Sequence, residues 1–186
     1  MRKLFFILII VLSLNKIQAQ EYNYARLSVL YGGNIPFNFN SIEKYRTGIE
    51  IVDGTILGIT LADSSQAGVI LEGFELNIRT FNGATSIRGD AYDLALDRIQ
   101  IRASNYLGLI AGTSFGYLDL SPAWITLFRY TNIPFTDLSW DSHQLSLSYG
   151  CGIPVSEGGN GTLLGEEPDY YHVELEVEIM PIGQGF

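Results

Sequence analysis

The chain has 186 residues, of which 47% are hydrophobic and 12% aromatic, and its formal net charge at pH 7 is −9. This length suits one domain with a sizeable hydrophobic core. The acidic balance argues against binding of nucleic acids or of anionic membrane surfaces, because both require a basic surface. It favours solubility, or contacts with cations and basic partners.

Residues 1–19 have the three-part layout of a secretory signal peptide. Arg2 and Lys3 precede an apolar run at 4–14, and a short polar stretch then ends at Ala19. The run is shorter than the roughly 20 residues of a membrane-spanning helix. We therefore predict cleavage after Ala19, which leaves a single domain of residues 20–186. Three of the 11 basic residues and none of the 20 acidic ones lie in this leader, so cleavage would change the net charge to −12.

The rest of the chain consists of short runs with a two-residue hydrophobic period, separated by Gly, Pro, Asn and Asp. This pattern is typical of an all-β sandwich or barrel. It predicts strands at 25–31, 35–40, 49–52, 55–62, 69–80, 98–104, 123–130, 143–151 and 170–180. About nine strands suit two packed sheets. We expect an antiparallel β-sandwich of about 8–10 strands, immunoglobulin-like or jelly-roll-like.

Several short segments carry local predictions. Residues 41–48 form a turn or a single helical turn, and 92–100 include a second short helical turn. Asp53 followed by Gly54 indicates a hairpin between two strands. Gly73, inside a long strand, indicates a bulge or bend.

The last predicted strand has the clearest alternation in the chain. Successive side chains of a strand point to opposite faces, so one face is buried and the other meets water, as in an antiparallel sheet. The buried face comprises Tyr171, Val173, Leu175, Val177 and Ile179, and the polar face comprises His172, Glu174, Glu176 and Glu178. Pro181 and Gly183 are expected to interrupt the strand.

The single cysteine, Cys151, falls in phase with the apolar residues of its strand. A buried structural thiol is therefore favoured over a nucleophile paired with His143 or His172. No H-E-x-x-H, C-x-x-C, P-loop or dinucleotide pattern is present. We expect a non-enzymatic protein with no cofactor and no metal site.

Candidate interaction residues lie in the long loop at 152–169 and among the aromatic residues. Loops of this length are uncommon in compact domains and often functional. Exposed tryptophans stack on sugars or anchor protein partners, and Trp124 is predicted to share a strand face with Phe128 and Tyr130. Calcium binding by the acidic loop stays open, although no EF-hand spacing supports it. The candidates are Trp124, Trp140, Glu157, Glu166, Glu167 and Asp169.

Several segments resemble small exported β-sandwich proteins of gram-negative bacterial surfaces. They are FNFNSIEKYRTGI at 37–49, GFELNIRT at 73–80, RIQIRA at 98–103, and the ends HQLSLSYGCG and PDYYHVELEVEIMP. GFELNI also resembles the Trp-x-Leu element of WxL-type surface domains, with Phe74 in place of the tryptophan. The resemblance, shared with fimbrial and adhesive domains, implies a structural or adhesive surface role and no catalytic residues.

These features predict an exported structural or interaction protein at the cell surface, in the periplasm or outside the cell. It would be a surface or filament component, or an accessory subunit of an outer-membrane protein assembly. A protein partner at the envelope would bind at sheet edges or loops, for example by strand addition. No membrane-spanning helix is predicted after the leader. Two alternatives stay open: a carbohydrate-binding module that takes a glycan, and a small outer-membrane β-barrel.

Overall fold

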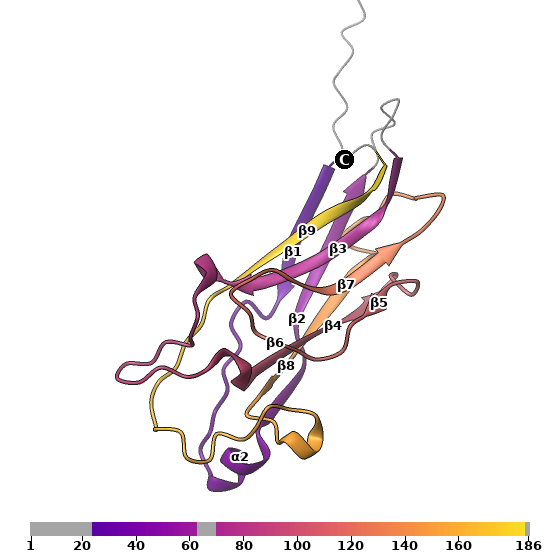
Figure 1. Cartoon of the computed structure of the whole chain (residues 1–186). Helices are drawn as coiled ribbons and strands as arrows, with labels where there is room; N and C mark the ends of the chain where they lie inside the picture. Colours follow the sequence, from indigo (N-terminus) through magenta and orange to yellow (C-terminus); the bar gives the residue numbers. More distant parts are fainter. Residues whose placement is uncertain (1–23, 63–69, 185–186) are drawn as a thin grey trace, which may run out of the picture.

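The structure, a computed structural model, describes residues 24–62 and 70–184, so the predicted leader and the turn expected at 63–68 lie outside it. Two antiparallel sheets pack face to face, with strand orders β1-β2-β8-β4-β6 and β5-β7-β3-β9 (Figure 1). This confirms the predicted β-sandwich. The strands are β1 (Tyr24–Tyr31), β2 (Ile49–Ala62), β3 (Ile70–Thr80), β4 (Ile99–Leu107), β5 (Thr113–Ser114), β6 (Leu118–Asp119), β7 (Ile125–Thr131), β8 (Gln144–Cys151) and β9 (Leu175–Gln184).

In the described part of the chain, four short helical segments lie in the connections: α2 (Ile42–Thr47) and the 3-10 turns η1 (Phe81–Gly83), η2 (Leu96–Arg98) and η3 (Val155–Glu157). The Ser41 side chain caps α2 by accepting a hydrogen bond from the Lys44 N–H, and Gly48 ends it with a φ of 72°. Both helical turns expected from the sequence, α2 and η2, are thus confirmed.

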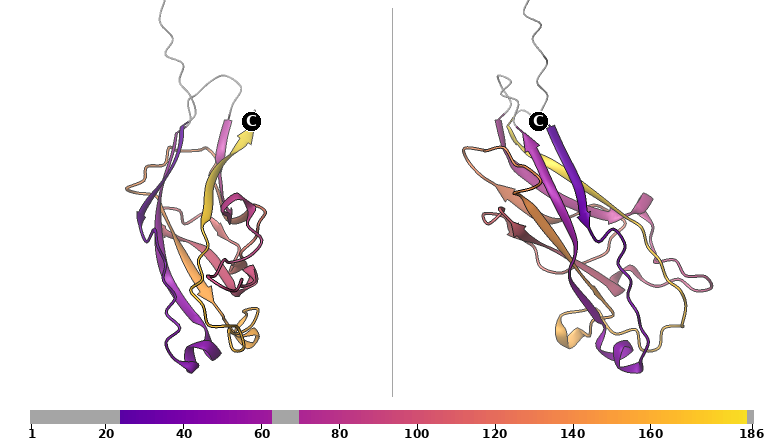
Figure 2. Two further views of the ribbon diagram at one scale, coloured as in Figure 1. Left: turned by 90° about the vertical axis from the view of Figure 1, so that its left-hand side faces the viewer. Right: turned by 180° about the vertical axis from the view of Figure 1, so that it is seen from behind.

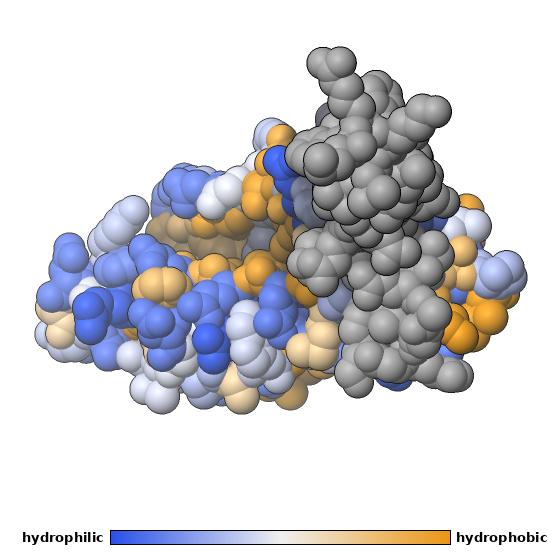
Figure 3. Space-filling view, turned by 90° about the horizontal axis from the view of Figure 1, so that it is seen from above, coloured by the Kyte–Doolittle hydropathy of each residue, from blue (hydrophilic) through white to orange (hydrophobic). Residues whose placement is uncertain are grey.

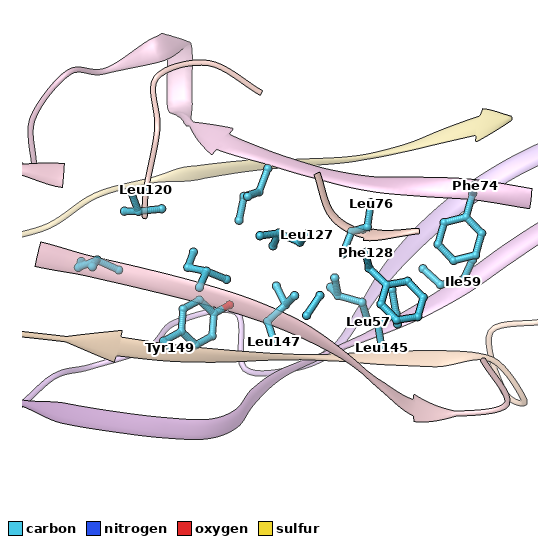
Figure 4. Packing of buried hydrophobic residues seen from close by; sticks show 14 of the residues in the cluster. Leu57, Ile59, Phe74, Leu76, Leu120, Leu127, Phe128, Leu145, Leu147 and Tyr149 are labelled. Atoms are coloured by element: carbon cyan, nitrogen blue, oxygen red, sulfur yellow. The ribbon is translucent and has the colours of Figure 1, made fainter. Parts of the chain in front are cut away.

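The core fills the space between the sheets with interdigitated side chains from both (Figure 4). Phe74 and Phe128 are almost completely buried, and the ring of Phe74 lies 5.7 Å from that of Tyr130, measured between centroids. Aromatic side chains bury large apolar areas and gain further from such pairing. Removal of this apolar surface from water is the main term that holds the two layers together.

The hairpin expected at Asp53 and Gly54 is absent, because β2 runs straight through both residues. Asp53 adopts a left-handed φ of 51°, and the pairing with β8 shifts there from Ile51 to Thr55. Its backbone N–H donates to the hydroxyl of Ser148 on β8 over 3.1 Å. The turn signal thus produces a bulge, since β2 keeps its pairing with β8 on both sides of it.

The last strand also departs from expectation, because β9 continues through Pro181 and Gly183 to Gln184. β9 is an edge strand, where the missing N–H of a proline is tolerated. The irregularity predicted at Gly73 is confirmed: the pairing of β3 with β9 shifts register between Leu71 and Gly73. A Cβ on Gly73 would lie 1.9 Å from the Tyr130 carbonyl oxygen, so only glycine fits there.

The edges of the two sheets on one side of the sandwich are β1 and β9. The two strands contact each other, and below them the segment that follows β1 and the segment that precedes β9 run apart before both approach α2 (Figures 1 and 2). There the chain after β1 continues at 32–40 without joining β2, which pairs over Ile49, Glu50 and Ile51 only with β8. The opposite side is closed, since the hydroxyl of Ser114 on β5 donates to the Ala103 carbonyl on β4.

Candidate functional site

A large apolar cleft lies between the two sheets on the side where β1 and β9 form the edges. It encloses about 1020 Å³, the upper end of the ~300–1,000 Å³ range of small-molecule pockets. Its lining comes from β1, the segment 32–40, α2, the loop before β9, and β9 itself. Figure 3 shows apolar residues within a hollow between the layers and hydrophilic residues along much of its rim.

Two extended segments form the walls of the cleft. Along 33–39, the side chains of Ile35, Phe37 and Phe39 are half-buried against the core, whereas those between them are exposed. Within the described residues, no hydrogen bond involves the backbone of 33–37. The predicted strand at 35–40 thus has strand-like alternation but no strand partner.

The opposite wall is the segment 171–177. Tyr171, Val173, Leu175 and Val177 face the core, as the alternation predicted. Before β9 begins, the segment is held to the fold by the paired backbones of Arg88 and His172 and by the bond from the Phe81 N–H to the Glu174 carbonyl. β9 pairs only with β3 among the described strands, so its other edge faces the cleft.

The floor of the cleft is apolar and includes the single thiol. Cys151 is buried as predicted, and burial raises its pKa to about 12. A reactive cysteine needs the opposite shift, so this thiol is structural. Beside it, the hydroxyls of Tyr149 and Thr55 lie 2.8 Å apart, and Thr55 donates to the Gly32 carbonyl over 2.6 Å. These bonds fix the start of the first wall to the floor.

The end of the cleft near α2 is acidic. The lining includes the four carboxylates Glu166, Glu167, Asp169 and Glu174, and no lysine or arginine lines it among the described residues. Burial, together with the nearby charges of Asp169, Glu166 and Glu167, raises the pKa of the Tyr171 phenol. That phenol donates to the Glu167 carbonyl over 2.7 Å. The three acids of the loop are thus gathered around one aromatic ring of the cleft.

Two of these acids already have partners within the fold. Glu166 forms an ion pair with Arg98 at 3.0 Å. Asp169 accepts hydrogen bonds from the backbone N–H groups of Ala91 and Tyr92, which lower the pKa of its carboxyl. Glu167 and Glu174 make no ion pair with another described residue. Unbalanced negative charge therefore remains at the rim.

The other predicted interaction residues lie away from the cleft. Glu157 borders a separate depression of about 210 Å³ with Glu50 and Tyr117. Trp140 is half-exposed and lies against Gly58 of β2. A Cβ added to Gly58 would lie only 3.0 Å from the Cβ of Trp140. The structure thus gathers Glu166, Glu167 and Asp169 at one site and leaves the remaining candidates apart.

Trp124 does not share a face with Phe128 and Tyr130, contrary to the prediction. Leu76 of β3 pairs with Phe128 of β7, and the next residue, Asn77, pairs with Thr126. Leu127 is therefore an extra residue in β7, a bulge. Both Leu127 and Phe128 are buried as a result, and the alternation changes phase. Trp124 is 37% exposed, with the Arg79 guanidinium 4.4 Å from its ring centroid.

Residues 112–116 are Gly-Thr-Ser-Phe-Gly and match the pattern Gly-x-Ser-x-Gly. The prediction of a non-enzymatic protein did not take this match into account. A nucleophilic serine in this pattern sits on a sharp turn between a strand and a helix. Ser114 lies instead in the two-residue strand β5, which no helix follows, and its hydroxyl donates to the Ala103 carbonyl. His143 is engaged with the backbone of Ser139. The motif does not form a nucleophile elbow.

Among the described residues, no three His, Cys, Asp or Glu side chains are grouped so that they could hold a metal ion. Within the same part of the chain, no helix is long and apolar enough to cross a membrane. None of the known protein-family models matches the chain, and none of the curated proteins matches its sequence. The class that the fold defines is therefore an antiparallel β-sandwich with an apolar cleft between two sheet edges.

Proposed function

We propose that this protein is a non-enzymatic structural or interaction protein of the cell envelope that binds a protein partner by strand addition. The proposed partner is a component of a surface filament or of an outer-membrane assembly. The observation that carries the proposal is the open cleft, whose floor is apolar. One of its walls, 33–37, makes no backbone hydrogen bond within the described residues, and the other wall includes the free edge of β9. The export signal predicted at 1–19 and the resemblance to exported surface proteins are the reasons to place it at the envelope.

Strand addition supplies what such a cleft lacks. Exposed sheet edges pair with an extended segment of another chain through backbone hydrogen bonds, and pockets between the sheets accept alternate side chains. An apolar hollow of this size, left open to water, is also unfavourable, because apolar surface gains free energy when it is buried.

The test is capture of partners from the native envelope by the purified protein and by two variants. Val173→Glu places a charge in the cleft, and Met180→Glu places the same charge on the outer face of β9. We expect that the wild type and M180E both capture the same partner, detected by cross-linking, and that V173E does not. Retention of every partner by V173E, or a wild type that stays monodisperse and binds no envelope component, would refute the proposal.

A further inference from the structure

We infer that the occupant of the cleft, whose existence rests on the proposed function, is an extended peptide segment of a partner protein. It carries apolar side chains at alternate positions and a lysine or arginine at the end that lies over Glu166, Glu167 and Asp169. Three features of the cleft lead to this assignment: the free edge of β9, the apolar floor, and the charge of one end.

The free edge of β9 has room for one added strand. Among the described strands β9 pairs only with β3, and a strand on its other edge would lie about 4.8 Å from it. The opposite wall lines the same cleft, and its backbone at 33–37 makes no hydrogen bond within the described residues. Each wall is about seven residues long, so the accepted segment spans roughly 23 Å at 3.3 Å per residue.

The alternation follows from the floor. Side chains of an inserted strand point alternately toward the floor and toward solvent. The floor beneath it is made of buried apolar side chains, among them Leu57, Leu147 and Leu163. Only every second residue of the occupant thus needs to be apolar, and the residues between them meet water.

The charge identifies one end of the occupant. Four carboxylates and no lysine or arginine line the cleft among the described residues, and three of the four lie together in the loop before β9. A cation over this end is attracted, whereas an anion is repelled. The same charge disfavours a fatty acid, whose carboxylate would meet the acidic end and whose chain cannot use the free backbone groups of 33–37.

The test is a titration of the purified protein with synthetic nine-residue peptides. The first, the lysine peptide, alternates valine and threonine between two terminal lysines. The second, the glutamate peptide, has glutamates in place of these lysines. The third has the composition and the terminal lysines of the first, but its valines are consecutive. We expect the lysine peptide to bind about ten-fold more tightly than the glutamate peptide at low salt, with the difference reduced at high salt. The third peptide should bind most weakly.

Matched variants locate the charge effect. Glu167→Gln should weaken binding of the lysine peptide about three-fold, and Glu157→Gln, in the same loop but outside the cleft, should leave it unchanged. Equal affinities for the lysine and glutamate peptides would overturn the inferred cation. If the third peptide bound as tightly as the lysine peptide, the inferred alternation would be wrong. Binding of oleate in preference to all peptides would identify a lipid site.

The two proposals fail separately. If none of these peptides binds while V173E still abolishes capture of the native partner, the inferred alternation and terminal cation of the occupant are wrong and the proposed function stands. If V173E captures the partner as the wild type does, the proposed function is wrong.

Discussion

Ionisation of the single cysteine measures how dry the floor of the cleft is. Cys151 is 4% exposed, and burial raises its pKa from 9.0 to about 12. The folded protein therefore keeps the thiol neutral at pH values at which the unfolded chain already carries a thiolate. Because the folded pKa lies above the unfolded value, this contribution to stability is complete below pH 9 and is lost as the pH rises toward 12.

The size of the loss follows from the two pKa values. Each pH unit above the unfolded pKa favours the unfolded state by about 1.4 kcal/mol until the folded pKa is reached. At about pH 10.5 the cysteine alone lowers the free energy of unfolding by about 2 kcal/mol. The half-buried Tyr117 and the buried Tyr149, whose pKa values burial also raises, add a loss of the same sign.

Cys151→Ala separates the thiol from the tyrosines, because the variant keeps both phenols. Urea denaturation of the two proteins, in reductant, at about pH 7 and about pH 10.5 gives the comparison. We expect the wild type to lose about 2 kcal/mol more than C151A between these pH values. Equal losses would show that water reaches the thiol in the folded state, and would refute a dry, apolar floor.

Three further predictions concern the frame of the cleft and the alternative function. Gly73→Ala should lower the free energy of unfolding by about 3 kcal/mol, because the added Cβ would overlap the Tyr130 carbonyl oxygen. Gly33→Ala, whose added Cβ would meet no other atom within 4 Å, should change this free energy by under about 0.5 kcal/mol. Urea denaturation measures both. Thr55→Val should cost about 1–3 kcal/mol in the same assay, because the buried Tyr149 hydroxyl loses its partner. Tryptophan fluorescence should not respond to polysaccharides, and a response abolished by Trp140→Phe would favour a carbohydrate-binding module.

The sequence predicts the sandwich well, because two-residue alternation is a local property. The five inward-facing residues of the last strand, from Tyr171 to Ile179, pack against the core as the pattern indicates. Alternation says nothing about partners, however. The segment at 35–40 alternates as β9 does, yet none of the described strands pairs with it, and it forms one wall of the cleft.

Bulges explain the errors of face and of turn. Leu127 is one extra residue in β7 and moves Trp124 to the opposite face from Phe128. Asp53 absorbs a hairpin signal within β2. The local sequence does not predict either bulge, because the position of a bulge depends on the register of the neighbouring strand.

The candidate site was predicted in part. Loop length and acidity pointed to Glu166, Glu167 and Asp169, which lie at one end of the cleft. The same reasoning selected Glu157, which lies elsewhere. The walls and floor went unrecognised as a site because their apolar residues have the same pattern as an ordinary core.

Amide hydrogen exchange tests the central claim, that the backbone edges of the cleft accept a strand. The purified protein is measured with and without the lysine-flanked peptide. We predict that exchange slows at 33–39 and 171–177, the two walls, and stays unchanged in β7, which lies away from them. Protection confined to other surfaces, or binding without slower exchange at either wall, would contradict the account.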